Sequence, residues 1–366
     1  MPGSERGPRD ATPGNLPRSS TFSVAVMTPF RPRARAVALG AGLCLPLLSA
    51  AAAPVPEKVV GPEPCAECHI QEIEVWKLSK HFKSGAGLHQ RQESIDIARR
   101  LGLADIRQDT QCQSCHYLSQ TVDGATKVMS GVSCESCHGA ARDWVKVHGD
   151  FGAGVTVATE SPEHRAKRWS TSEAAGLIRP ADFYSVGQNC YGCHILQDEK
   201  LVNVGGHTPG RDGFNLLTWT QGEVRHNIHH TGDKANPVAP PADQRRLFVL
   251  GCVLEVEYGF RAVAHATTKA TFGLTYARQA DAARKQLEKI QALAPTPELA
   301  AIIKVANATG LKLNHAAELN AAAGEISRLA RRFATQVTGE QLAAIDAILP
   351  GPESYQGTPY HVMGSP

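Results

Sequence analysis

The sequence lacks several features that mark common classes of protein. Its 366 residues hold 38 Lys and Arg against 35 Asp and Glu, so it has no excess of positive charge of the kind that binds nucleic acid. It contains no phosphate-binding glycine loop, no nucleophile elbow and no H-E-x-x-H motif, which argues against the catalytic classes that they mark. Methionine is scarce, at four residues. Hydrophobic residues make up 42%, which is typical of a globular protein and not of a disordered one.

Residues 1–52 are predicted to be a leader and signal peptide, with translation starting at Met27. Basic residues from Arg31 to Arg35 precede an apolar stretch at 36–48 and small residues at 49–53, which is the order of an export signal. The alternatives are an uncleaved anchor helix and a stretch of buried core. Cleavage after Ala52 would leave 32 basic and 33 acidic residues, no transmembrane segment, and a protein in the periplasm. In that oxidising compartment cysteines become disulfides, metal ligands or cofactor attachments.

Cysteine and histidine are frequent, at 10 and 15 residues. Cys44 lies in the leader, and eight of the other nine cysteines form four C-x-x-C-H motifs. Two thiols at this spacing can form thioether bonds with the vinyl groups of one haem, and the adjacent histidine can bind its iron. Zinc sites and disulfides also use paired cysteines, but neither explains the histidine after every pair. The sequence therefore predicts four covalently bound c-type haems, at Cys65, Cys68 and His69, at Cys112, Cys115 and His116, at Cys134, Cys137 and His138, and at Cys190, Cys193 and His194.

The sixth ligand of each iron sets its chemistry. Only Met129 and Met363 lie outside the leader, so histidine is predicted for most of the irons. His81 lies about 18 Å along a helix from its own motif, so it is expected to bind the haem of a neighbouring motif. The predicted distal ligands are His81, His148, His207 and His226, with His229 and His230 as alternatives and His89 and His164 behind them, whereas His265, His315 and His361 are expected at the surface or in packing.

Two motifs, together with the residues after them, resemble the multihaem cytochromes typified by cytochrome c-554. Cys65-Ala-Glu-Cys68-His69 is followed by Trp76, Ser79 and His81, and Cys134-Glu-Ser-Cys137-His138-Gly139 is followed by His148. The resemblance spans residues 60–230. It implies an exported tetrahaem electron carrier with closely paired haems and with His81 and His148 as distal ligands. In the type member the second haem has no side chain as its sixth ligand, so the resemblance also implies an open face at His116.

The fold is predicted to be mainly α. A haem-organised region at 53–236, with short helices and little regular sheet, precedes an antiparallel helical bundle at 242–350 and a tail at 351–366. One helix is expected to contain Ile73, Trp76, His81 and Phe82. Bundle helices are expected at 244–266, 271–293, 297–307 and 314–337, and a short one is expected to end at Pro350.

These patterns predict a periplasmic tetrahaem c-type cytochrome that relays electrons by outer-sphere transfer between other redox proteins. It is predicted to be an electron carrier and not an enzyme. Two further hypotheses stay open: an oxidoreductase that acts on a small nitrogen or sulfur compound at a haem with an open axial site, and a sensor that binds a partner through the bundle. The apolar stripes of the bundle are expected to pack within the chain, with an oligomer contact as the alternative. The haem propionates add negative charge, so a docking partner is expected to present a basic surface.

Overall fold

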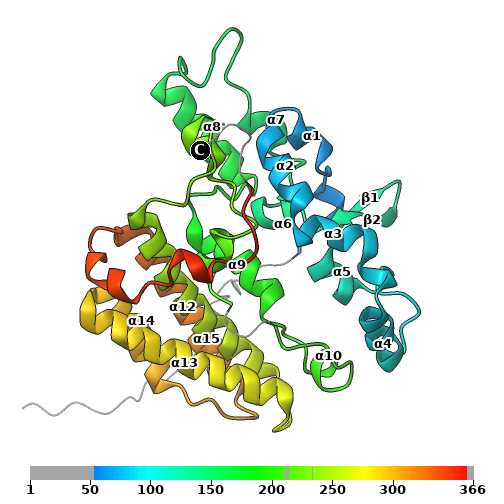
Figure 1. The fold of residues 1–366 in the computed structure, drawn as a ribbon, viewed down its shortest axis with the longest axis vertical. Helices are drawn as coiled ribbons and strands as arrows, with labels where there is room; N and C mark the ends of the chain where they lie inside the picture. The colour runs from blue at the N-terminus through cyan, green and yellow to red at the C-terminus, as the bar shows by residue number, and fades with distance from the viewer. Residues whose placement is uncertain (1–52, 211–213, 233, 361–366) are drawn as a thin grey trace, which may run out of the picture. The chain divides into compact units, whose positions relative to one another are not determined.

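The structure is a computed structural model that describes residues 53–210, 214–232 and 234–360 (Figure 1). The described residues are 60% helical and contain a single two-stranded sheet. The prediction of a mainly α fold is confirmed. Within the described ranges, no helix is long and apolar enough to cross a membrane. The predicted leader and signal peptide, together with His361 and Met363, lie outside the described residues.

Short helices make up the fold as far as residue 231. Many begin at a side-chain cap, in which the oxygen of a Ser, Asp or Asn accepts a backbone N–H of the first turn. Caps of this kind let helices of only one to three turns form between the motifs. Their bounds are η1 Pro56–Lys58, α1 Glu63–Ala66, α2 Ile70–Leu78, α3 Lys80–Gly87, η2 Leu88–Gln90, α4 Gln92–Leu101, α5 Thr110–His116, α6 Cys134–His138, α7 Val145–His148, α8 Pro162–Ala174, α9 Phe183–His194, α10 Glu199–Asn203, α11 Leu216–Thr220 and η3 Asn227–Thr231.

The helix expected to carry both Trp76 and His81 is broken at Ser79. Ser79 has φ −73° and ψ 159°, which is extended backbone, and its hydroxyl accepts the N–H of Phe82 as the cap of α3. The spacing of apolar residues continues across Ser79, so the sequence pattern does not reveal the break. The prediction of one continuous helix is wrong, because the capping interaction starts a second helix one residue before His81.

A β-hairpin connects the second and third motifs. Strand β1 (Tyr117–Val122) pairs antiparallel with β2 (Ala125–Gly131), with Tyr117 opposite Gly131. The turn residues Asp123 and Gly124 both have positive φ, 52° and 76°, as a tight two-residue hairpin turn requires. The hairpin supplies a surface on which α3 packs.

The second part of the fold is a set of helices α12 (Pro241–His265), α13 (Thr271–Leu293), α14 (Pro297–Ala308) and α15 (Ala316–Gln336). These lie within about three residues of the predicted bounds, the usual margin at helix ends. Thr296 caps α14 by accepting the N–H of Leu299 at 3.2 Å, as the sequence predicts. The expected last helix is instead a 3-10 turn, η4 (Ala343–Ile348), followed by η5 (Pro352–Ser354). Ahead of η4, the N–H of Thr338 donates to Gln341 Oε1 at 2.7 Å.

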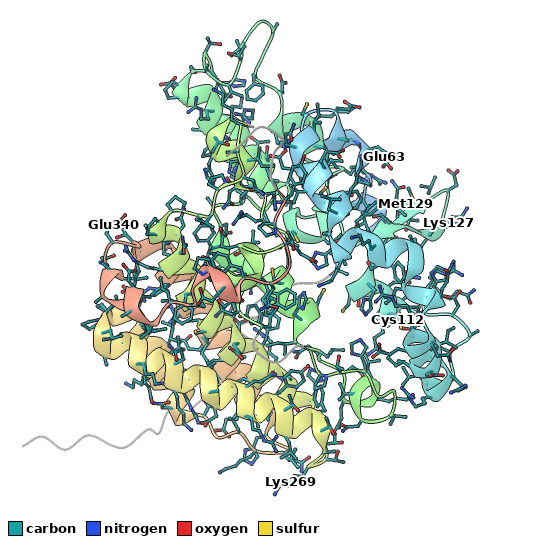
Figure 2. All side chains as sticks on the ribbon, in the orientation of Figure 1. Glu63, Cys112, Lys127, Met129, Lys269 and Glu340 are labelled. Carbon is teal, nitrogen blue, oxygen red and sulfur yellow. The ribbon has the colours of Figure 1, made fainter. Side chains whose placement is uncertain are left out.

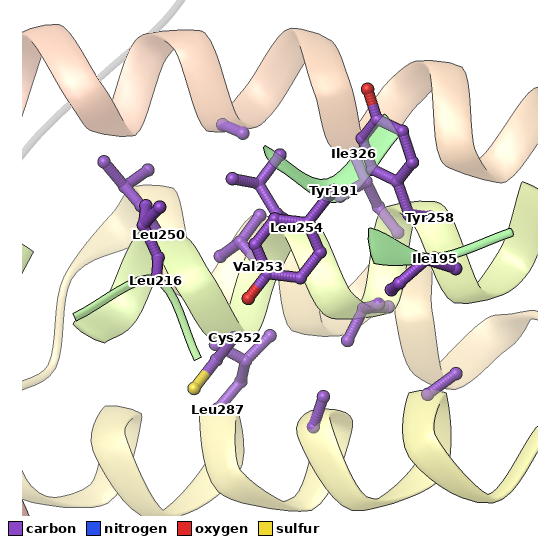
Figure 3. Packing of buried hydrophobic residues seen from close by; sticks show 14 of the residues in the cluster. Tyr191, Ile195, Leu216, Leu250, Cys252, Val253, Leu254, Tyr258, Leu287 and Ile326 are labelled. Atoms are coloured by element: carbon purple, nitrogen blue, oxygen red, sulfur yellow. The ribbon is translucent and has the colours of Figure 1, made fainter. Parts of the chain in front are cut away.

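A single hydrophobic core joins the helical bundle to the fourth motif. Helix α9 packs against α12 and α15, and Tyr191, in the fourth motif, lies among bundle residues such as Leu254 (Figure 3). The apolar run at 247–254 of α12 is buried within the chain, as expected. Cys252 is buried in this core too. The boundary between residues 236 and 242 remains a prediction.

Candidate haem-binding sites

Each C-x-x-C-H motif lies at a helix end. The second, third and fourth motifs close α5, α6 and α9, and His69 of the first motif caps α2. On a helix, residues three and four apart share a face. Both cysteines and the histidine of a motif can therefore face one flat group. No disulfide joins any of the nine cysteines in the described residues.

The structure places a second histidine beside each motif histidine. Each partner comes from a segment distant in the sequence, and all four were predicted as distal ligands. The ring centroids are 6.2 Å apart for His69 and His148, 6.0 Å for His116 and His207, 6.2 Å for His138 and His226, and 6.2 Å for His194 and His81.

These separations fit one metal ion between two imidazoles. A first-row metal binds an imidazole nitrogen at about 2 Å, and that nitrogen lies about 1.1 Å from the ring centre. Two rings on opposite sides of one ion therefore have centres about 6 Å apart. Four pairs of unrelated origin share this spacing, so the donor set fits four irons that each have two histidine ligands.

Hydrogen bonds at the other ring nitrogen orient several of these histidines. Nδ1 of His138 lies 2.9 Å from the Ile178 carbonyl, and Nδ1 of His148 lies 2.6 Å from that of Val145. His207 and His226 make the same kind of contact, at 2.7 and 2.8 Å, with nearby carbonyls. A carbonyl can only accept, so Nδ1 carries the proton and the lone pair of Nε2 is left for a metal.

Burial favours the neutral form of four of the paired rings. It lowers the pKa of His116 and of His138 to about 4, with the neighbouring histidines adding to the effect. It also lowers the pKa of His81 and of His148. Imidazole binds metal in its neutral form, so these environments suit ligation.

Helix α3 holds His81 through contacts with the hairpin and the second motif. The Ser84 hydroxyl donates to the carbonyls of His81, at 2.8 Å, and of His116, at 2.9 Å. Gly85 of α3 and Gly131 of β2 approach so closely that a Cβ on Gly131 would lie 2.2 Å from the His81 oxygen. Both glycines are needed for this approach.

A buried ion pair holds His148. Arg168 of α8 makes two hydrogen bonds with Glu160, at 2.6 and 2.7 Å, and also donates to the His148 carbonyl. The Arg168 guanidinium lies 4.4 Å from the centre of the Phe151 ring. Neither Glu160 nor Arg168 stands out in the sequence, because their pairing depends on how α7 and α8 pack.

Turns position the two remaining partners. The N–H of His207 donates to the Leu201 carbonyl at 3.1 Å, beyond Gly206, whose φ is +73°. His226 precedes η3, and the next residue, Asn227, donates its N–H to Asn236 at 2.9 Å. The rings of the alternatives His229 and His230 lie against each other, with centroids 3.9 Å apart and a tilt of 41°, whereas His164 pairs with Glu160 and His315 with Glu318.

Hydrogen bonds between the motifs show which of them are neighbours. Glu135 of the third motif accepts the N–H groups of Val60 and Gly61, just before the first motif, at 3.0 and 2.9 Å. Asn189, next to the fourth motif, donates to the Cys137 carbonyl of the third at 2.8 Å. The Cys193 thiol of the fourth motif lies 3.9 Å from the Ser114 carbonyl of the second.

The comparisons with known proteins agree with this site. Residues 64–139, which hold the first three motifs, match the family described as cytochrome c554 and c-prime. A relative, cytochrome c-554 of Nitrosomonas europaea, is 25% identical over 143 residues, which are 37% of this chain and 57% of the relative. No solved structure matches the chain.

The first three motifs therefore lie in a segment similar to a family of c-type cytochromes, the class of proteins that carry covalently bound haem iron. Within that class the comparisons support the cytochrome c-554 family, and the predicted resemblance is confirmed. The fourth motif lies beyond the segment that the family model matches.

Proposed function

We propose that the chain is an exported, periplasmic tetrahaem c-type cytochrome that relays electrons between other redox proteins. The observation that carries the proposal is the set of four histidine pairs with ring centroids 6.0–6.2 Å apart. Each haem, when bound, would supply one-electron chemistry between ferric and ferrous iron. The signal predicted at residues 1–52 and the resemblance support export.

The residues that would hold each haem follow from the pairs. The cysteines of each motif would form the thioether bonds, and the motif histidine would be the proximal ligand. His148 would complete the first site, His207 the second, His226 the third and His81 the fourth. His81 comes twelve residues after His69 of the first motif, yet it lies beside His194 of the fourth. The ligands would therefore cross-link distant segments of the chain.

The neighbouring motifs form a series. Contacts join the first motif to the third, the third to the fourth, and the fourth to the second. Haem sites in direct contact with one another are suited to passing electrons from one iron to the next. Two histidines at every iron would leave no axial position for a substrate, which favours a carrier over the oxidoreductase hypothesis.

Low-temperature EPR of the purified holoprotein tests this proposal. Protein secreted from a host that matures c-type cytochromes should carry the added mass of four haems and show only low-spin signals of irons with two histidine ligands. Mass spectrometry and a pyridine haemochrome assay give the haem count independently of the EPR spectrum. Fewer than four haems, or a high-spin iron that binds nitrite or hydroxylamine and turns it over, would overturn the proposal.

A further inference from the structure

The four motifs differ in how far the protein covers them. The side chain of His69 is 52% exposed, and Cys68 is exposed as well. The other three motif histidines are half-buried. His194 is the best enclosed by aromatic rings, since it stacks on Phe214 with centroids 4.4 Å apart and lies 5.4 Å from the Trp219 ring. Every motif would hold the same group, so these differences come from the protein itself.

The first and second motifs are the two ends of the proposed series, and their surroundings differ in charge. From residue 59 to residue 76 the chain has four carboxylates and no Lys or Arg, and one of the four, Glu74, makes an ion pair at 3.1 Å with the next basic residue, Lys77. Around the second motif, residues 91–109 hold four basic and four acidic side chains. Figure 2 labels Glu63 on α1 and Cys112 on α5, at well-separated places. The surroundings of the first motif are therefore acidic and its histidine is exposed, whereas the surroundings of the second motif are balanced in charge.

Resting on the proposed function, we propose that electrons are exchanged with a basic redox protein at the first-motif face, which consists of Glu63, Glu67, His69 and Ile70. All four residues are exposed, and Ile70 is 60% exposed. A small apolar patch surrounded by charge of one sign is typical of weak, short-lived electron-transfer complexes. The negative charge attracts a basic partner and speeds the encounter, while Ile70 provides apolar contact next to the exposed ligand.

The test measures electron transfer to a lysine-rich monohaem cytochrome c by stopped flow. The reduced holoprotein loses one electron, and the ferric probe gains it. The double variant Glu63→Gln, Glu67→Gln removes two charges from the first-motif face. The control Glu93→Gln, Glu298→Gln removes two charges from α4, beside the second motif, and from α14. Both variants therefore have the same net charge.

At low ionic strength we expect the first variant to lower the second-order rate constant about threefold, and the control to change it less than about 1.5-fold. The difference should vanish at high salt, and with ferricyanide, an anionic oxidant, it should reverse in sign. An equal fall of the rate constant in both variants, or no fall in either, would overturn the proposal that the partner docks at the first-motif face. Haem mass and EPR spectra of the same samples show whether the proposed function itself fails, since they do not depend on these rates.

Discussion

At the scale of single residues, the structure distinguishes histidines that lie beside a motif histidine from those that lie elsewhere at the surface. His207 is the sharpest case, because the resemblance implies an open iron at His116 and yet the His207 ring lies 6.0 Å from that of His116. His230 also lies after the fourth motif, but its ring contacts that of His229. These two histidines form a matched pair for substitution.

His207→Ala should leave one iron with a single protein ligand. We expect one of the four haems to become high-spin and the ferrous protein to bind one carbon monoxide per chain, because an axial position opens. His230→Ala should bind none. EPR and carbon monoxide titration measure both outcomes. Unchanged low-spin signals in His207→Ala would show that another group completes the second site.

Glu160 gives the protein a pH dependence that can be measured. Hydrogen bonding with Arg168 lowers the pKa of Glu160 from 4.5 to about 2. Because the folded-state pKa is depressed, the stabilisation is complete above pH about 4.5 and is lost as the pH falls toward about 2.

Glu160→Gln should therefore lower the melting temperature by about 2–4 °C at pH 7, and by much less at pH 3. Calorimetry at the two pH values measures the difference. Glu163→Gln, an exposed position three residues further on in the first turn of α8, is the control and should have little effect at either pH. If the melting temperatures of wild type and Glu160→Gln differed by the same amount at both pH values, the role given to the ionised carboxylate would be contradicted.

At the scale of elements, the contact between α3 and β2 leaves no room for added atoms. Gly131→Ala would place a methyl group 2.2 Å from the His81 carbonyl oxygen, so α3 or β2 must shift. We expect a loss of about 1–3 kcal/mol in unfolding free energy. His81 should also detach, giving a high-spin signal at the fourth site. Gly87→Ala, at the end of α3, meets no atom within 4 Å and should keep all haems low-spin.

The sequence predicts some elements well and others poorly, for physical reasons. The C-x-x-C-H motifs and the capped start of α14 at Thr296 are local, because their chemistry is complete within five residues. The hairpin also had a local signal, Asp123-Gly124, which the sequence interpretation overlooked. The partner of each motif histidine is different, since His81 and His194 are 113 positions apart and meet only through packing. The number and positions of the histidines thus predicted which of them would lie beside a motif histidine, but not which motif each would face.

At the scale of the whole molecule, the bundle and the fourth motif share polar contacts as well as a core. The buried Tyr184 hydroxyl of α9 lies 2.6 Å from Glu257 of α12 and 2.8 Å from Ser327 of α15. Arg261 also donates to Glu257, at 2.9 Å. This network links three helices.

Tyr184→Phe should leave the Glu257 carboxylate short of a partner and lower the unfolding free energy by about 1–3 kcal/mol. Because the core is shared, we expect the bundle and the haem region to unfold in one transition. Calorimetry together with absorbance of the haem band measures this. Tyr355→Phe, with a partly exposed hydroxyl 3.2 Å from Gln244, is the control and should cost less. Two separate transitions in the wild type would show independent domains.

The pairing of His81 with His194 has a consequence for how such a protein is made. A polypeptide that leaves the cell interior from its N-terminus delivers His81 long before the segment that it must meet. The opening stretch cannot reach its final arrangement until residue 194 has been translocated, and His138 must wait further for residue 226. The early segments would therefore have to stay accessible to the maturation apparatus until nearly two thirds of the chain had emerged.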